Sequence, residues 1–285
     1  MTTRTYTELY GLISALAGVS SFTTNEQTNI LAFVNRRLYQ GYRATETWPR
    51  YLIGAQARPA PSNLISRTFT PASQNISSAT RSGTTVTVVL PAAVDFVEGM
   101  YVTVASLTYS TNPNGSYQSG AISTTTVEND TFTYELTTGT GTETYGGSGT
   151  VIANAVPEID SFTRVWSNNP LDINSGREYE FYVDSDGARV VGNSSSLQGF
   201  WVGFLKVWGG PFTALSTDIP QELYEYTAHA SYADFLRMDG QVEKAAAEEV
   251  IAQQYLVVEL DKAENQRNTN VLQRRISTYV SRSNR

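Results

Sequence analysis

The chain offers few residues for catalysis, and His229 is the only histidine among its 285 residues. A serine hydrolase would use this imidazole as general base beside a Gly-x-Ser-x-Gly nucleophile elbow, which the sequence lacks. With one histidine and no cysteine, neither a zinc site nor a thiol nucleophile is expected. His229 stands between small residues of a predicted helix, so we expect it to be packed or at the surface.

The acidic residues form patterns that resemble two kinds of site. The run 184–187, Asp-Ser-Asp-Gly, resembles the start of a calcium loop, but further acidic ligands are missing and a hairpin turn is expected instead. The pairs Glu222/Glu225 and Glu248/Glu249 lie on predicted amphipathic helices, where such pairs usually form a solvated face. We therefore expect no catalytic residue, no metal site, no cofactor and no enzyme activity.

The composition describes a chain with a real core and a sparsely charged surface. Apolar residues make up 40% and aromatic residues 11% of the chain, while charged residues make up only 16%. A low charged fraction suits subunit contacts, and it also suits β-rich proteins with threonine-heavy strands. No signal peptide is recognised, and no apolar run approaches the ~18 residues that span a bilayer. We expect a soluble protein, made in a cytosol, without a membrane partner.

Charge is unevenly distributed along the chain. Residues 262–285 contain six basic side chains and one acidic side chain, a net charge of +5, which leaves −12 for the rest of a chain whose total is −7. An acidic body repels nucleic acid on average. The basic end either favours an acidic docking partner or is a solvated tail.

Two helices are predicted near the N-terminus. Residues 5–17 place several apolar side chains on one side, as an amphipathic helix does. A second helix is expected to begin at Thr24, with the Thr24 hydroxyl as its cap and Gln27 completing a capping box. This helix should end before Trp48-Pro49, because proline disfavours helix in the preceding residue.

Composition changes between residues 74 and 153, where Thr, Ser and Gly dominate and lysine is absent. Alternating runs separated by turn signals predict strands at 84–90, 101–105, 122–127 and 131–136. About 80 residues of this kind can form an independent antiparallel barrel or sandwich. We predict an all-β domain at 74–153, inserted into a body made of residues 1–73 and 154–265.

The C-terminal third begins with a strand and a helical hairpin. The strand Phe200–Trp208 is apolar on both faces, so it must lie between two layers, or between one layer and another subunit. Its candidate packing residues are Phe200, Trp201, Phe204 and Trp208. The hairpin turns at Asp239-Gly240. The predicted apolar stripe of its second helix is Val242, Ala246, Val250, Val257 and Leu260.

Residues 266–285 form a polar and basic arm with apolar residues at nearly helical spacing. Such a segment can fold when it binds a partner. The residues expected to dock are Arg267, Leu272, Arg274, Arg275, Ile276, Tyr279 and Arg282.

The order of these parts resembles the head-to-tail connector, or adaptor, proteins of tailed bacteriophages, including the tail tubular protein A class. The resemblance covers about residues 5–55 and 155–265. It rests on the N-terminal helix at 24–48, the strand Phe200–Trp208, the helix start at 215–222 and the turn at 239–241. The insertion is similar to small β-domains of phage virion proteins, on the runs 96–104, 114–117 and 131–134, with Met100 where an acidic residue is usual.

The resemblance implies an α+β fold: a helical bundle with a small antiparallel sheet, the inserted β-domain and an extended C-terminal arm. It also implies a virion structural protein that forms a homo-oligomeric ring, typically a dodecamer, at the head–tail interface. The ring would bind the portal protein through the arm at 266–285 and join it to a tail or neck protein. DNA would pass through the channel during genome ejection without sequence-specific binding, and an acidic body suits such passage.

Other functions remain open at this point. The same helices and insertion suit another neck, tail-completion or baseplate subunit. The tyrosines of the insertion suit a glycan-binding adhesin, although the insertion has no tryptophan to form a strong sugar platform. An enzyme fits the residues least.

Overall fold

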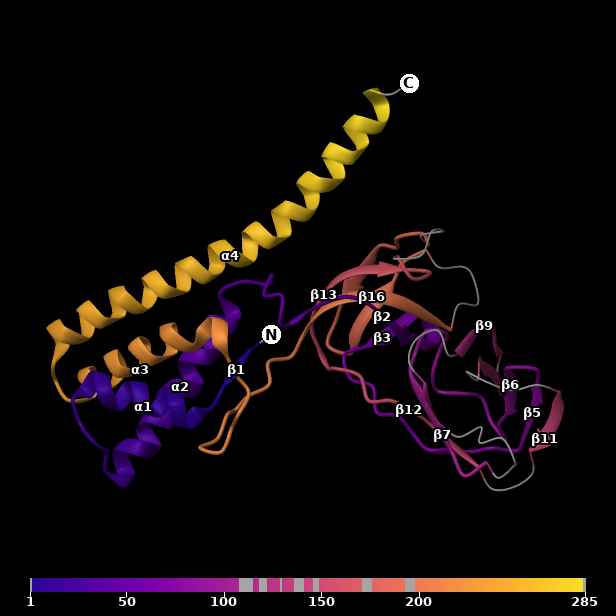
Figure 1. Cartoon of the computed structure of the whole chain (residues 1–285), viewed down its shortest axis with the longest axis horizontal. Coiled ribbons are helices and arrows are strands. Elements are labelled where there is room, and N and C mark those ends of the chain that lie inside the picture. Colours follow the sequence, from indigo (N-terminus) through magenta and orange to yellow (C-terminus); the bar gives the residue numbers. More distant parts are fainter. Residues whose placement is uncertain are drawn as a thin grey trace. The chain divides into compact units, whose positions relative to one another are not determined.

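The computed structural model describes residues 2–107, 115–117, 122–128, 130–135, 141–145, 149–170, 176–192 and 198–283, and for 115–117, 122–126, 128 and 267–283 it describes the backbone alone. The described chain is a mixed α+β protein with four α-helices and several small antiparallel sheets, none of which closes into a barrel. Its internal contacts divide it into two compact units. We call Met1–Leu52 with Trp208–Arg285 the helical unit and Ile53–Val207 the β unit (Figure 1).

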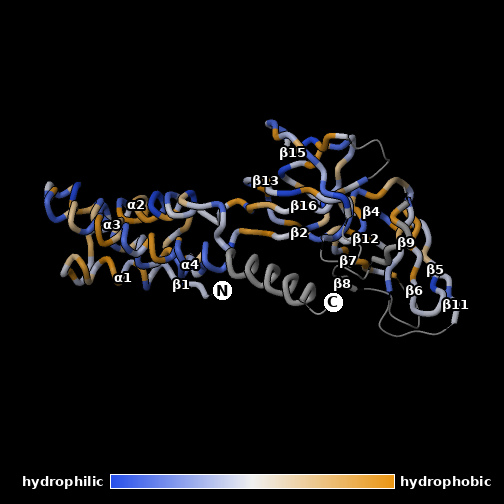
Figure 2. Tube along the Cα trace, turned by 90° about the horizontal axis from the view of Figure 1, so that it is seen from above, coloured by the Kyte–Doolittle hydropathy of each residue, from blue (hydrophilic) through white to orange (hydrophobic). Residues whose placement is uncertain are grey.

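In the helical unit, α3 contacts each of α1, α2 and α4, so α3 is the central helix. Hydrophobic and hydrophilic residues alternate along these helices, as expected for elements with one buried side (Figure 2). Fully buried core residues include Leu9, Ile13, Ile30, Val34, Ala230 and Ala233. The elements are β1 (Thr3–Arg4), α1 (Tyr6–Ala17), α2 (Thr24–Arg43), β17 (Ile219–Pro220), the 3-10 helix η2 (Gln221–Leu223), α3 (Tyr224–Met238) and α4 (Val242–Ser283), and β1 pairs with β17.

The start of α2 is fixed by a capping box one residue earlier than the sequence predicted. The Thr23 hydroxyl accepts the backbone N–H of Glu26, and the Glu26 carboxylate accepts the backbone N–H of Thr23 at 2.8 Å. Thr24 is already the first helical residue. The predicted cap at Thr24 with Gln27 is therefore wrong by one position, because two neighbouring threonines offered the same signal.

The helices α3 and α4 form the expected hairpin, but α4 turns a different side toward α3 than predicted. Gly240 adopts the left-handed conformation, with φ of 78°, that ends α3. The predicted stripe is wrong for four of its five residues: Val242, Ala246, Val250 and Val257 are exposed, while Leu260 is partly buried. The buried side of α4 is instead formed by Ala245, Ala252, Leu256 and Ala263.

The β unit contains two three-stranded sheets, in the orders β13-β16-β2 and β14-β15-β3. The predicted hairpin turn at 184–187 joins β14 to β15, and the Asp184 carboxylate accepts the backbone N–H groups of Asp186 and Gly187 at 2.9 and 3.1 Å. The elements are β2 (Leu52–Pro59), the 3-10 helix η1 (Pro61–Asn63), β3 (Leu64–Ser66), β13 (Ile159–Trp166), β14 (Phe181–Val183), β15 (Gly187–Val190) and β16 (Gly199–Lys206).

The inserted segment forms two further sheets, in the orders β11-β5-β6-β10-β9 and β4-β12-β7-β8. Side chains from both sheets share one hydrophobic core, which includes Val86, Val88, Phe132, Tyr134, Val102, Val104 and Val151. A closed barrel is not formed in the described part of this segment. The strands are β4 (Gln74–Asn75), β5 (Ser78–Ser82), β6 (Thr85–Val89), β7 (Val102–Ala105), β8 (Gly115–Tyr117), β9 (Ile122–Glu128), β10 (Thr131–Glu135), β11 (Thr142–Tyr145) and β12 (Thr150–Ala153).

The core of the insertion extends onto the flanking strands. Ala57 of β2 belongs to this core, and Trp201 of β16 packs against it. Gly99 is needed at this contact, because a Cβ there would lie 2.4 Å from the Trp201 ring and its φ of 84° favours glycine. The unit boundaries therefore fall at 52/53 and 207/208, whereas the sequence placed boundaries at 73/74 and 153/154.

Candidate functional site

The outward side of α4 is an apolar helix surface that the described residues leave uncovered. Val250 and Val257 are seven residues apart, hence on the same side of the helix, and they are 58% and 52% exposed. Val258 on the neighbouring rows is 51% exposed. These valines and Ala246 line an open groove of about 620 Å³. We call this feature the α4 groove.

The buried side of α4, opposite the α4 groove, carries mainly small residues. Ala245, Ala252 and Ala263 are fully or nearly fully buried on α4, and Ala230 and Ala233 are fully buried on α3. Small side chains on both helices allow a close approach of the two axes. Among the described side chains of α4, Leu256 is the one large aliphatic residue that is buried.

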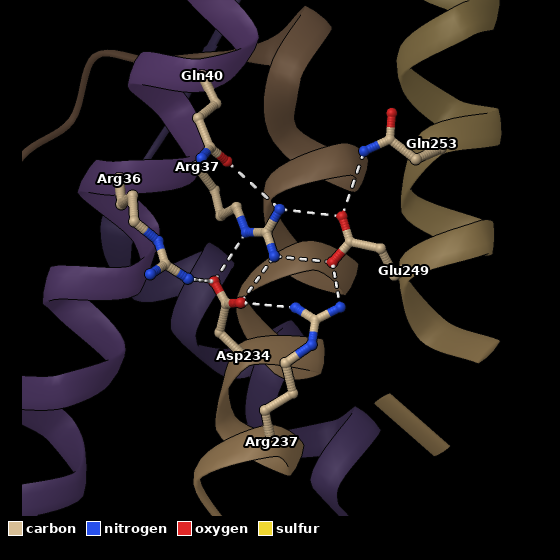
Figure 3. Close-up of polar contacts among 7 residues, drawn as sticks. All are labelled: Arg36, Arg37, Gln40, Asp234, Arg237, Glu249 and Gln253. Carbon is tan, nitrogen blue, oxygen red and sulfur yellow. Dashed lines mark hydrogen bonds and ion pairs between the residues drawn. The ribbon is translucent and has the colours of Figure 1, made fainter. Parts of the chain in front are cut away.

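A charged cluster at one rim of the groove ties α4 to α2 and α3 (Figure 3). Arg37 of α2 donates from Nε and Nη2 to Asp234 of α3, both at 2.7 Å. The same guanidinium donates from Nη1 and Nη2 to Glu249 of α4 at 2.9 and 2.7 Å. The side chains of Arg37 and Asp234 are 9% and 3% exposed. One buried guanidinium thus joins three helices through bidentate contacts, the strong form of this ion pair.

Two further arginines complete the cluster from its solvent side. Arg36 Nη2 lies 2.5 Å from Asp234, and Arg237 lies 2.9 Å from Asp234 and 3.0 Å from Glu249. Their side chains are 54% and 42% exposed. Three guanidinium groups and two carboxylates leave the cluster with a net charge of +1. Arg237 and Glu249 also line the α4 groove, so its rim carries one positive and one negative side chain, paired with each other.

The cluster holds its carboxylates ionised. Burial raises the pKa of Asp234, but hydrogen bonds from Arg37 and Arg36 outweigh burial and hold that pKa below its ordinary value. Burial also raises the pKa of Glu249, but hydrogen bonds from Arg37 and Gln253 outweigh burial and lower that pKa. Burial opposes the charge of Arg37, yet its hydrogen bonds to Asp234 and Glu249 raise its pKa above the ordinary range. Both carboxylates are fully engaged, so they act as structural ties and are poorly placed for proton transfer.

His229 lies between α3 and α4, away from any arrangement expected of a hydrolase. Its Nδ1 is 2.8 Å from Glu248 Oε2, and its ring stacks on Tyr255 with centroids 5.3 Å apart. Within the described ranges, no three His, Cys, Asp or Glu side chains come together as a metal site requires. Of the other acidic pair, Glu222/Glu225, Glu222 forms an ion pair with Arg50 at 2.6 Å.

The four predicted packing residues are divided between the two units. Phe200 and Phe204 are 1% and 0% exposed and belong to the core under the β13-β16-β2 sheet, and Trp201 packs on the insertion. These three are covered by the chain itself. Trp208 lies beyond the end of β16 and packs in the helical unit, 5.3 Å from Tyr39 and 5.6 Å from Phe212 between ring centroids.

The backbone of the predicted docking arm continues α4 as a helix to Ser283. The side chains of its docking residues lie outside the described ones, and they remain a prediction. These residues are Arg267, Leu272, Arg274, Arg275, Ile276, Tyr279 and Arg282.

The sequence did not indicate the α4 groove or the charged cluster. Arg37 and Asp234 are 197 positions apart, so no local pattern joins them. A usable signal existed for the groove: α4 carries apolar residues around more than half of its circumference, as Val250, Ile251, Ala252 and Val257, Val258 show. A helix with two apolar sides needs two partners.

The comparison with protein-family models matches no family, and the comparison with curated proteins finds no significant match. Among the described residues, no helix combines the length and the apolar character needed to cross a membrane.

Proposed function

We propose that this chain is a virion structural protein, a head-to-tail adaptor that forms a ring under the portal and joins the capsid to the tail or neck. The observation that carries the proposal is the α4 groove, a row of half-exposed valines on a helix already packed on its other side. An exposed apolar helix surface of this kind commonly marks a protein contact. The proposal uses no catalytic residue.

The groove favours repeated self-contact. Covering a half-exposed valine contributes about 1 kcal/mol, so three or four valines give a weak contact between two copies. In a closed ring each copy makes such a contact on both sides, and the ring becomes firm although each contact is modest. A ring wall built as a helical bundle from α2, α3 and α4 is consistent with such modest, repeated contacts between copies.

Charge supports the remaining parts of the proposal. The body of the chain carries −12 and residues 262–285 carry +5 in a total of −7. An acidic channel wall would let DNA slide, since it releases no counterions from the phosphates. The basic arm at 266–285 would grip the portal, and the inserted β sheets would decorate the outside and contact the tail or neck.

The proposal is tested by combining the full-length chain with the portal protein encoded in the same genome. Electron cryo-microscopy should show a closed ring, of twelve copies on a twelve-fold portal, stacked on the portal. A chain that neither co-sediments with the portal nor forms a ring on it would contradict the proposal. A ring that does not bind the portal would favour a neck, tail-completion or baseplate subunit.

Two variants test the role of the arm in portal binding. R274E/R275E should lose portal co-sedimentation, whereas K244E, an exposed change on the same helix outside the arm, should retain it. Circular dichroism should show the same helix content for both, because neither position lies in the described core. Portal binding by R274E/R275E equal to that of the wild type would remove the arm from the proposal.

A further inference from the structure

The valines of the α4 groove lie between acidic side chains on the same side of α4. Glu243 precedes Val250 by seven residues, a spacing that keeps both residues on one side of a helix. Asp261 and Glu264 follow Val257 by four and seven residues, with the same consequence. All three acids are exposed, and none of them forms an ion pair with a described residue. The groove is therefore an apolar surface with negative charge at each end.

Basic residues in the described part of the same helix do not neutralise these ends. Lys244 stands six residues before Val250, about 120° around the helix from the valines. Lys262 stands five residues after Val257, about 140° around the helix, and it pairs with Glu259 at 2.5 Å. A partner that covers the groove would therefore meet acids at both ends, and basic residues on that partner would be favoured.

Two copies that turn their grooves toward each other would bring like charges together. In an antiparallel pairing, Val250 of each copy would pack on Val257 of the other. Glu243 would then stand opposite Glu264, because both pairs are centred on the same point of the helix. A parallel pairing in register would place every acid opposite the same acid of the other copy. Like charges in opposition weaken association, so the groove favours an apolar partner that carries basic residues and no acidic ones.

The basic arm of this chain has that chemistry. It contains five arginines and no acidic side chain. Leu272, Ile276 and Val280 follow each other at intervals of four residues, the spacing of one helical side, over about 12 Å. The apolar stretch of the groove from Val250 to Val258 has the same length. The arm therefore matches the groove in apolar length and complements it in charge.

A parallel alignment shifted by 22 residues brings both kinds of residue together. It places Leu272 of one copy beside Val250 of the other. Along the axis, each acid then lies within two helix positions, about 3 Å, of an arginine. The three pairs are Glu243 with Arg267, Asp261 with Arg282, and Glu264 with Arg285.

The arm that covers a groove must come from another copy. The backbone of α4 is one helix from Val242 to Ser283, and Leu272 lies about 33 Å beyond Val250 along its axis. An arm that continues its own helix cannot fold back onto that helix. The arm and the groove of one chain are therefore available to different neighbours.

We infer that the arm of one copy binds the α4 groove of a second copy in parallel, with Leu272 and Tyr279 on the valines and arginines at the acidic ends. This contact rests on the proposed function and names its subunit interface, while Arg274, outside the apolar spacing of the arm, is left for the portal. Since arm and groove are different surfaces, the contact is heterologous: each copy gives its arm to one neighbour and its groove to the other. Repeated association of this type closes into a ring or grows as a filament.

The absence of cysteine from the chain allows a direct test by disulfide crosslinking on the portal-bound complex. V257C and Y279C, which the shift of 22 residues places side by side, are purified separately, mixed with portal and oxidised. We expect a covalent dimer from the mixture and none from either variant alone. Y255C in place of V257C is the matched control, because Tyr255 is 42% exposed but lies outside the groove, two residues from Val257. It should not crosslink to Y279C.

A charge swap between the two partners tests the register. D261R, added to the V257C chain, should lower the yield of the crosslink at a fixed oxidation time by about fivefold. R282D, added to the Y279C chain, should restore that yield, because opposite charges then meet again at this end of the groove. Thermal unfolding of D261R should be unchanged, since Asp261 is exposed. An unchanged yield with D261R alone would contradict the proposed alignment.

The remaining outcomes separate this contact from the proposed function. A covalent dimer from V250C mixed with V257C would show that the grooves face each other, and it would overturn the arm contact. A wild-type ring on the portal without the V257C–Y279C crosslink would also overturn it and leave the proposed function standing. If the wild type does not bind the portal, the proposed function fails. The crosslink, run on the concentrated chain alone, then decides whether this self-contact exists.

Discussion

Arg58 of β2 is a buried cation with little to compensate it. Its side chain is 1% exposed, its Nη2 donates to the Pro157 carbonyl, and its Nε and Nη1 have no hydrogen-bond partner among the described residues. The guanidinium lies 4.9 Å from the centroid of the Phe204 ring, which gives some cation–π attraction. Burial lowers the pKa of Arg58 to about 10. A charge that is desolvated without a counter-charge destabilises the folded state.

Replacing this cation with an apolar side chain of similar length should therefore stabilise the β unit. We expect Arg58→Met to raise the free energy of unfolding by about 1–3 kcal/mol, measured by urea denaturation at pH 7. As a control, Arg67→Met should destabilise, because Arg67 donates to the Asp160 carbonyl at 2.5 Å and lies over Phe162. A less stable R58M variant would contradict this account of Arg58.

The same substitution predicts a pH dependence. The folded state binds the Arg58 proton more weakly than the unfolded chain does, since the folded pKa is about 10 against an ordinary 12.5. The destabilisation of the folded state by the buried Arg58 charge is fully present below about pH 10, and it decreases as the pH rises toward 12.5. The stability advantage of R58M over the wild type should therefore shrink above pH 10.

At the scale of elements, the start of α2 gives a prediction with a built-in control. Thr23→Ala removes the hydroxyl that accepts the Glu26 N–H and should cost about 1 kcal/mol of unfolding free energy. Thr24→Ala changes the neighbouring threonine, which only occupies the first turn, and should cost less than about 0.5 kcal/mol. Urea denaturation followed by the helical circular dichroism signal measures both. Equal costs would mean that the cap is shared between the two threonines.

The elements show how far the sequence alone could lead. The four α-helices, the strand before the hairpin and the turn at 184–187 were predictable, because proline, glycine and hydrophobic period mark them locally. The side of α4 that faces α3 was not predictable, since apolar residues occur on both sides and alanine packing decides between them. The charged cluster around Arg37 was also not predictable, because its members meet only after α2, α3 and α4 have packed.

At the scale of the whole molecule, the insertion is less independent than its composition suggested. The contacts of Trp201 and Ala57 with its core mean that removing residues 74–153 would expose a tryptophan on β16. We expect this deletion, bridged by a short Gly/Ser linker, to lower hydrogen-exchange protection of the amides in β16 and β13. The amides of α2 and α3 should keep theirs, because the helical unit has its own core.

A point variant separates this contact from the deletion itself. Trp201→Ala keeps the insertion and should reproduce part of the loss of protection in β16, with a destabilisation of about 3 kcal/mol as for other large aromatic truncations. If β16 stays fully protected after the deletion, the insertion contributes nothing to the stability of the strands around it.

The length of α4 gives the molecule a mechanical property. The helix has 42 residues, about 63 Å at 1.5 Å per residue. Ala263 is the last buried residue among its described side chains, and the helical backbone continues to Ser283, about 30 Å further along the axis. The Arg37 cluster ties α4 to α2 and α3 near the start of this helix. A tilt of about 10° there would move a point about 30 Å further along the axis by about 5 Å, so the stiffness of this contact sets how accurately the helix is aimed.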